Sequence, residues 1–268
     1  MNSERGDGLS YISDADVNME FWQNTKVVYD EYTHQGMIYL TPDNHGGYAI
    51  PDNAFTGCET LEWIDIPDPV TSIGTKAFDH CTALDHVELP SSLMTLGTSA
   101  FSFCVFDRII LPERLLNIPD GAFEACAKLT NVYVGSNPTA ENPDSFVEGL
   151  PEGVTAIGAR AFGTSGLKNI VLHERIESIG KQAFFETKLV DFTIPASVSF
   201  IDASAFANCL DLGIIQILRE EPAVIGQYVF GEPSGYSVNL KLHVPSASLT
   251  AYRAADNWSY YYDNLIGM

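Results

Sequence analysis

Cysteine is the residue type in this chain whose spacing points most directly to chemistry. All five cysteines occur in one pattern, Ala-Phe-x-x-Cys, at Cys58, Cys81, Cys104, Cys126 and Cys209. This regularity could serve disulfide bonds, a zinc site or a nucleophilic thiol, and His80 beside Cys81 offers a base for the last. Each possibility demands a different geometry around sulfur, so the elements that carry the pattern must be identified first.

The Ala-Phe pair recurs along most of the chain. Its alanines are Ala54, Ala77, Ala100, Ala122, Ala161, Ala183 and Ala205, with steps of 23, 23, 22, 39, 22 and 22 residues. A fixed period of this length predicts a solenoid, in which each coil buries its apolar side against its neighbours. The long step is explained by an insertion at 135–153, whose prolines and acidic residues indicate a protruding loop.

Each repeat continues with a segment such as LDHVELP at 84–90. Alternating apolar residues that end at a proline are typical of a short strand with one buried face. We therefore expect one short parallel strand per coil, with irregular or 3-10 structure on the convex side.

The full repeat, roughly IGxxAFxxCxxLxxIxIPxxVxx, resembles the BspA-like branch of leucine-rich repeat proteins over about residues 50–268. The resemblance implies a leucine-rich repeat solenoid, a right-handed superhelix of about seven to eight coils with N- and C-terminal caps. Residues 1–49 are expected to form the first cap, with room for a degenerate repeat. Residues 50–222 should form the solenoid, and 223–268 a degenerate last repeat and a C-terminal cap in which a short helix carries Tyr252 and Trp258.

Stacking of the coils constrains what the cysteines can do. Their sulfurs would form a line along the solenoid axis, whereas zinc needs four converging ligands. Parallel Cβ vectors about 4.8 Å apart also exceed the roughly 3.8 Å mean of bridged cysteines. Ser165 and Thr187 occupy the same position in two repeats, so bridging is not required there.

We therefore predict a ladder of buried structural thiols, with no metal and no cofactor. The adjacent position predicts a second ladder of stacked aromatic rings, formed by Phe55, Phe78, Phe101, Phe123, Phe162, Phe184 and Phe206. An inward Cys81 would point away from His80, which argues against a catalytic pair.

Other motifs predict little chemistry. DADVNM at 14–19 begins like a calcium loop, but Met19 replaces the required glycine and Thr25 the glutamate, so a solvated turn is the alternative. Asn257 begins a glycosylation sequon. The chain has no phosphate-binding glycine loop, HExxH or GxSxG motif, and we predict that it is not an enzyme, with a glycan-active enzyme as the weakest alternative.

The chain is acidic, with 14 Lys and Arg against 35 Asp and Glu and a net charge of −21. This charge would repel phosphate backbones and argues against nucleic acid as a partner. No apolar run approaches the roughly 20 residues of a membrane span. The first residues lack the apolar core of a signal peptide, although a mature form would have lost one. We expect a monomer.

The outward residues of the strands vary from repeat to repeat, as a surface free of packing constraints would. The candidate binding patch combines aromatic and charged residues on successive strands: Trp63, Asp65, His86, Glu88, Arg108 and Tyr133. An ordinary solvated sheet face is the alternative.

The resulting functional hypothesis is a noncatalytic binding or adhesion module that recognises protein or glycan through the strand-bearing face. The resemblance implies secretion or a cell-surface location. An intracellular interaction scaffold in the cytoplasm is the alternative, which unbridged thiols and the missing signal peptide would suit.

Overall fold

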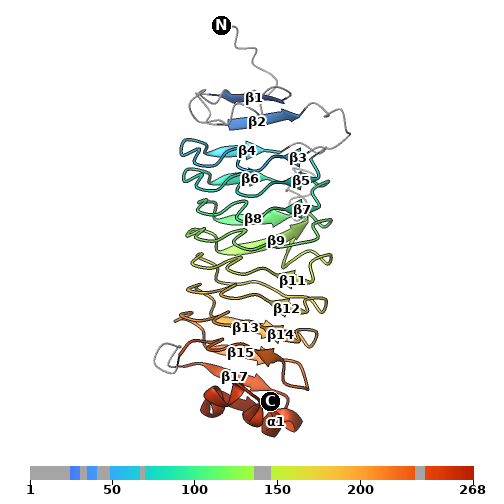
Figure 1. The fold of residues 1–268 in the computed structure, drawn as a ribbon, viewed down its shortest axis with the longest axis vertical. Helices are drawn as coiled ribbons and strands as arrows, with labels where there is room; N and C mark the ends of the chain where they lie inside the picture. The colour runs from blue at the N-terminus through green and yellow to red at the C-terminus, as the bar shows by residue number, and fades with distance from the viewer. Residues whose placement is uncertain (1–24, 31–34, 41–48, 67–69, 136–145, 233–238) are drawn as a thin grey trace.

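The protein is a stack of coils along one axis, with a helical segment at its C-terminal end (Figure 1). The computed structural model describes residues 25–30, 35–40, 49–66, 70–135, 146–232 and 239–268. The predicted solenoid fold is confirmed, because equivalent short strands of successive coils pair in parallel and in register.

Most coils have a strand of three to five residues at the predicted position, whereas the fifth coil has only an isolated bridge there, at Asn169. We call the sheet surface formed by these strands the strand-bearing face. The strands are β4 (Trp63–Asp65), β6 (His86–Glu88), β8 (Arg108–Leu111), β9 (Asn131–Gly135), β13 (Asp191–Ile194), β15 (Ile214–Ile217), β17 (Lys241–Val244) and, at the C-terminus, β18 (Leu265–Gly267). Before them, β1 (Thr25–Asp30) and β2 (Gln35–Leu40) form an antiparallel pair, and β2 pairs in parallel with β4.

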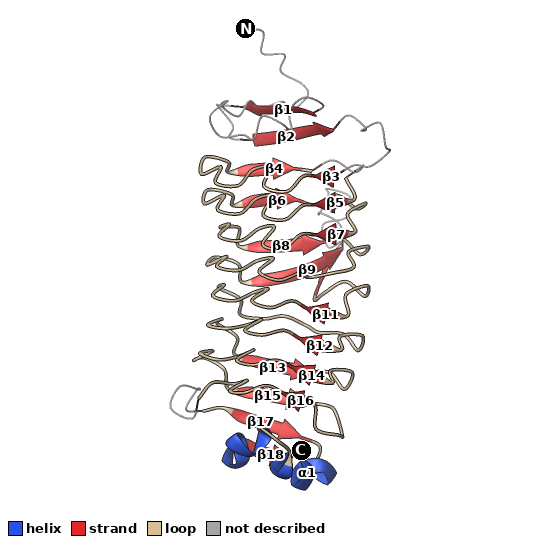
Figure 2. Ribbon diagram, in the orientation of Figure 1, coloured by secondary structure: helices blue, strands red, loops and turns tan. Residues whose placement is uncertain are grey.

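The prediction of one strand per coil is incomplete. Most coils add a second, two-residue strand, and these pair in parallel on another side of the solenoid (Figure 2). The second strands are β3 (Ala49–Ile50), β5 (Ser72–Ile73), β7 (Thr95–Leu96), β11 (Ala156–Ile157), β12 (Ser178–Ile179), β14 (Phe200–Ile201) and β16 (Val224–Ile225). Two residues are too few for an alternating pattern to be recognised in the sequence.

The Ala-Phe-x-x-Cys segment of each coil forms two consecutive turns, which we call the double turn. In coil three, Ser99 and Phe103 both have positive φ, at 54° and 62°. The backbone N–H groups of Ser99, Phe101 and Phe103 donate to the carbonyl oxygens of Asp120, Ala122 and Glu124 in the next coil. These bonds offset the cost of a left-handed backbone at residues other than glycine.

The convex side is therefore irregular, which is one of the two structures predicted for it. The other, a 3-10 helix, is not found in the described coils. The described 3-10 helices, η2 (Ser246–Ser248) and η3 (Trp258–Asn264), lie in the C-terminal segment.

The phenylalanines of the repeat form a continuous ladder in the interior. Neighbouring ring centroids are 4.9–6.0 Å apart, and the rings are nearly parallel. The ladder has one more member than the sequence analysis identified, because Phe230 stacks on Phe206 at 5.7 Å. The repeat pattern missed it because valine, Val229, replaces the preceding alanine.

The five cysteines are free and buried beside this ladder. The thiols of Cys104 and Cys126 donate to the carbonyl oxygens of Phe78 and Phe101, each in the preceding coil, with Sγ to O distances of 3.3 and 3.1 Å. This buried position, which occurs once per coil and which we call the slot, therefore favours a small side chain whose donor atom can reach the carbonyl oxygen of the preceding coil. Ser165, whose C–O bond is shorter, is buried in the same slot and its hydroxyl has no hydrogen-bond partner.

The insertion after β9 adds a strand to the sheet. Within the described part of the insertion, β10 (Phe146–Glu148) pairs antiparallel with β9, opposite Tyr133 to Gly135. The next coil meets β9 only at a bridge between Asn131 and Asn169. The strand-bearing face is consequently interrupted after the fourth coil, while β11, β12, β14 and β16 form a continuous sheet.

Aromatic side chains close the C-terminal end of the core. Tyr252 in α1 (Leu249–Ala254) and Trp258 in η3 are fully buried. The Trp258 indole N–H donates to the carbonyl of Ala223 at 2.8 Å, and the Tyr252 hydroxyl donates to that of Arg219 at 2.8 Å. Both polar groups are thus satisfied where the rings cover the last coil.

Candidate binding surface

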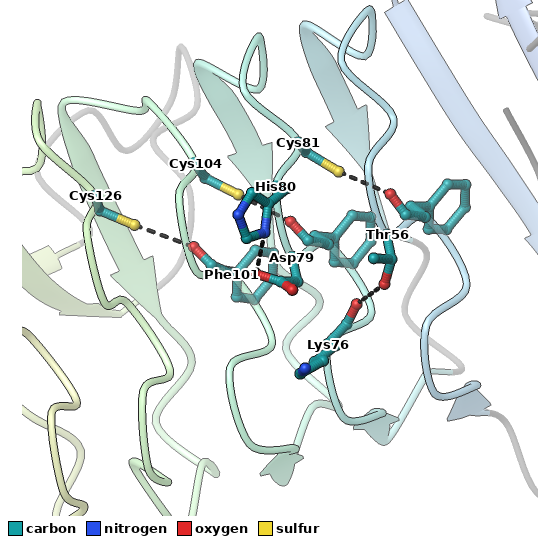
Figure 3. Close-up of polar contacts among 10 residues, drawn as sticks. Thr56, Lys76, Asp79, His80, Cys81, Phe101, Cys104 and Cys126 are labelled. Atoms are coloured by element: carbon teal, nitrogen blue, oxygen red, sulfur yellow. Dashed lines mark hydrogen bonds and ion pairs between the residues drawn. The ribbon is translucent and has the colours of Figure 1, made fainter.

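In the structure, the side chains of Cys81 and His80, whose sequence resembles a nucleophile with its base, bind different partners. The Cys81 thiol donates inward to the Phe55 carbonyl at 3.1 Å, while His80 Nδ1 lies 2.8 Å from Asp79 Oδ1 (Figure 3). Burial, and then the neighbouring Cys58, raise the pKa of the Cys81 thiol well above its usual value. A nucleophilic cysteine needs the opposite shift.

Four residues of the predicted patch lie together on two neighbouring strands of the strand-bearing face. The parallel register places Trp63 of β4 beside His86 of β6, and Asp65 beside Glu88. The Trp63 and His86 rings stack with centroids 5.9 Å apart, and His86 Nε2 lies 3.3 Å from Glu88 Oε1. The result is a surface with a flat aromatic part and an adjacent carboxylate part.

Arg108 and Tyr133 lie on the next section of the same face. β8 pairs with β9, so that Arg108 lies beside Asn131 and Ile110 beside Tyr133. In the described sheet pairings β6 and β8 belong to different sheets. The six residues therefore form two groups, four on β4 and β6 and two on β8 and β9.

The insertion supplies residues that the sequence analysis did not assign to this surface. Phe146 of β10 packs edge-on against Tyr133 with ring centroids 4.8 Å apart. The Asn131 side-chain amide donates to Glu148 Oε1 at 3.0 Å. The available signal was a short apolar pair, Phe146 and Val147, near the end of a segment otherwise rich in turn formers.

Outward and inward residues alternate here as predicted for a sheet with one buried face. Ile64, Val87 and Val132 point into the core and are buried. The outward residues between them are half-buried or exposed. The candidate side chains are thus available for contact.

Two further motifs of the sequence are the glycosylation sequon at Asn257 and the calcium-like segment at 14–19. Asn257 of the sequon has a left-handed backbone, and its side-chain amide donates to the Ile225 carbonyl at 2.7 Å, so the nitrogen that a glycan would modify already takes part in a structural hydrogen bond. The calcium-like segment at 14–19 lies outside the described residues.

Within the described ranges, no group of three or more His, Cys, Asp or Glu side chains could hold a metal ion. Nor does the described chain include a helix with the length and apolar character needed to cross a bilayer.

The stacked parallel strands, the aromatic ladder and the recurring 22–23-residue spacing define a repeat protein of the β-solenoid class. The chain belongs to the family of the BspA type leucine rich repeat region, whose model matches six copies over residues 48–149 and 148–256.

Solved structures of bacterial leucine-rich repeat proteins are similar to this chain. One is the leucine-rich repeat protein of T. pallidum, with 24% identity, coverage of 78% of this chain and 86% of that chain, and a TM-score of 0.48. Another is a leucine-rich cell surface protein from Faecalibacterium prausnitzii, with 20% identity, coverage of 89% and 76%, and a TM-score of 0.43. A third, from Eubacterium ventriosum, has 19% identity, coverage of 84% and 77%, and a TM-score of 0.39. No curated protein matches the chain.

Proposed function

We propose that this protein is a noncatalytic binding module that recognises a protein or glycan partner through the strand-bearing face. The observation that carries the proposal is the stacked Trp63 and His86 pair beside Asp65 and Glu88. The inward residues of the same strands are buried in the core. Aromatic rings provide apolar contact area, and the carboxylates beside them provide directional hydrogen bonds.

Arg108 and Tyr133 extend this surface along the solenoid axis. Because Phe146 supports the Tyr133 ring, the insertion contributes to the same binding face. Membership of a repeat family whose members commonly serve as binding and adhesion proteins supports the proposal. The rigid strands fix the spacing of the contact residues, which reduces the entropy lost when a partner binds.

Alanine substitution of both aromatic residues tests the proposal. We expect the double variant Trp63→Ala, Tyr133→Ala to bind at least about 30-fold more weakly to any ligand that the wild type recognises on a combined glycan and protein array, because interface aromatics dominate contact energy. Affinities of the wild type and the variant for each positive ligand should be measured by titration calorimetry.

The matched control is Leu210→Ala, Val224→Ala, which removes two exposed apolar side chains away from the candidate patch. Its affinities should equal those of the wild type. If the Trp63 and Tyr133 variant, with an unchanged circular dichroism spectrum, bound every ligand as the wild type does, recognition would not use this face.

A further inference from the structure

A second exposed aromatic group lies on the double turns, away from the strand-bearing face. The last residue before the cysteine position has positive φ in each of the seven coils that contain the Ala-Phe pair. Glycine and asparagine tolerate this left-handed conformation best, and bulky residues tolerate it poorly. The residues at this position are Gly57, His80, Phe103, Ala125, Thr164, Glu186 and Asn208.

Phe103 is the bulkiest residue at that position. Its φ is 62°, and its side chain is 42% exposed, so neither backbone preference nor burial in the core accounts for a phenylalanine there. The bonds to the next coil set the left-handed conformation, so the exposed aromatic side chain, and not the backbone, is the feature from which a functional role can be inferred.

Phe103 forms a stack with His80 of the preceding coil. The ring centroids are 4.2 Å apart and the planes are inclined by 22°. Asp79, which is only 7% exposed, holds the imidazole through the 2.8 Å contact between its Oδ1 and His80 Nδ1 (Figure 3). The pair is therefore a preorganised surface, because a buried group fixes one of its two rings.

The outer face of each ring has little covering it within this column of residues. On the His80 side the equivalent residue is Gly57, where even an added Cβ would meet nothing within 4 Å. On the Phe103 side it is Ala125, which offers one methyl group. Each outer face thus leaves room for one more planar group at the spacing of the coils.

The charge of the chain indicates which planar group fits. With a net charge of −21 the protein attracts cationic partners, and the arginine guanidinium is a planar, always charged group that stacks on aromatic faces. We propose that the His80 and Phe103 pair is a docking point for an arginine side chain of a basic partner protein. This inference does not depend on the proposed role of the strand-bearing face.

The test compares fluorescein-labelled octa-arginine and octa-lysine peptides, which carry equal charge but differ in planarity. Fluorescence anisotropy at about 0.15 M ionic strength should show the wild type binding the arginine peptide more tightly, by about fivefold. Because guanidinium also pairs with carboxylates anywhere on an acidic surface, the decisive result comes from variants.

Phe103→Asn should reduce this preference at least twofold while the protein stays folded, because asparagine suits a left-handed backbone. His80→Ala should reduce it similarly. Phe200→Ala, which removes another phenylalanine of nearly equal exposure, 40%, from β14, should leave it unchanged. Leu210→Ala, which removes another exposed apolar side chain, should also leave it unchanged.

An equal arginine preference in the wild type and in folded Phe103→Asn would overturn the proposal. A second contradicting result would be that the wild type binds an oligosaccharide, that Phe103→Asn loses this binding, and that the two peptides bind the wild type and the variants with the same preference.

Discussion

Replacing Phe101 with alanine is expected to lower the free energy of unfolding by about 3 to 5 kcal/mol. The ring is fully buried at the middle of the ladder and stacks on Phe78 and Phe123, with centroids 5.1 and 6.0 Å away. It also meets Phe106 edge-on. Removal leaves a cavity that the flanking coils cannot close, because their spacing is fixed by backbone hydrogen bonds on several sides. Urea unfolding followed by circular dichroism measures the change.

The matched control for this variant is Phe200→Ala, since Phe200 is exposed on the second sheet. Its effect should stay within about 1 kcal/mol. An equal effect of the two substitutions would mean that Phe101 lies outside the core.

The second large effect is expected at Gly180, where coils approach each other closely. A Cβ at this position would lie 2.7 Å from the backbone N of Ala159, 2.7 Å from the carbonyl carbon of Gly158 and 2.8 Å from the Ile157 oxygen. Gly180→Ala should therefore cost about 1 to 3 kcal/mol, because backbone atoms of the neighbouring coil must move. Asp202 occupies the equivalent position one coil later, so the backbone of a neighbouring coil can move far enough to accommodate a Cβ atom. The expected loss of stability is the free energy of that movement.

Gly213→Ala is the appropriate comparison for Gly180→Ala. The Cβ there would approach no atom closer than Asp191 Oδ1 at 3.5 Å, an ordinary contact. Its melting temperature should match or exceed that of the wild type, since alanine restricts the unfolded chain. A Gly180→Ala variant that melted no lower than Gly213→Ala would show that the coils are not packed this closely.

The solenoid could be predicted from the sequence because each coil repeats the same packing problem. Phe101 and its equivalents recur every 22–23 residues over most of the chain. A fixed spacing of this length indicates repeats that stack and bury the same side chain in each coil. The register of the outward residues followed from the alternation in segments such as LDHVELP. Trp63 and His86 accordingly lie side by side as the repeat alignment placed them.

Features that depend on backbone conformation could not be predicted. Positive φ at Lys76 or Phe103 has no sequence signal, because it is imposed by hydrogen bonds to the next coil rather than by glycine or asparagine. The pairing of β10 with β9 depends on where the insertion folds back, which a turn-rich segment leaves open. The binding role of the six candidate residues stays a prediction, since outward position permits contact without requiring it.

The most direct test of the account is the reactivity of the cysteines. Its central claim is that the coils share one interior, which contains the aromatic ladder and all five thiols and leaves the outer surfaces for recognition. Burial disfavours the thiolate there and raises the pKa of Cys209, for example, to about 11. An aromatic disulfide reagent at neutral pH should therefore react with none of the thiols in the minutes after mixing with the native protein, and with all five after denaturation without reductant. Rapid reaction of the native protein, or fewer than five thiols in the denatured protein, would contradict the account.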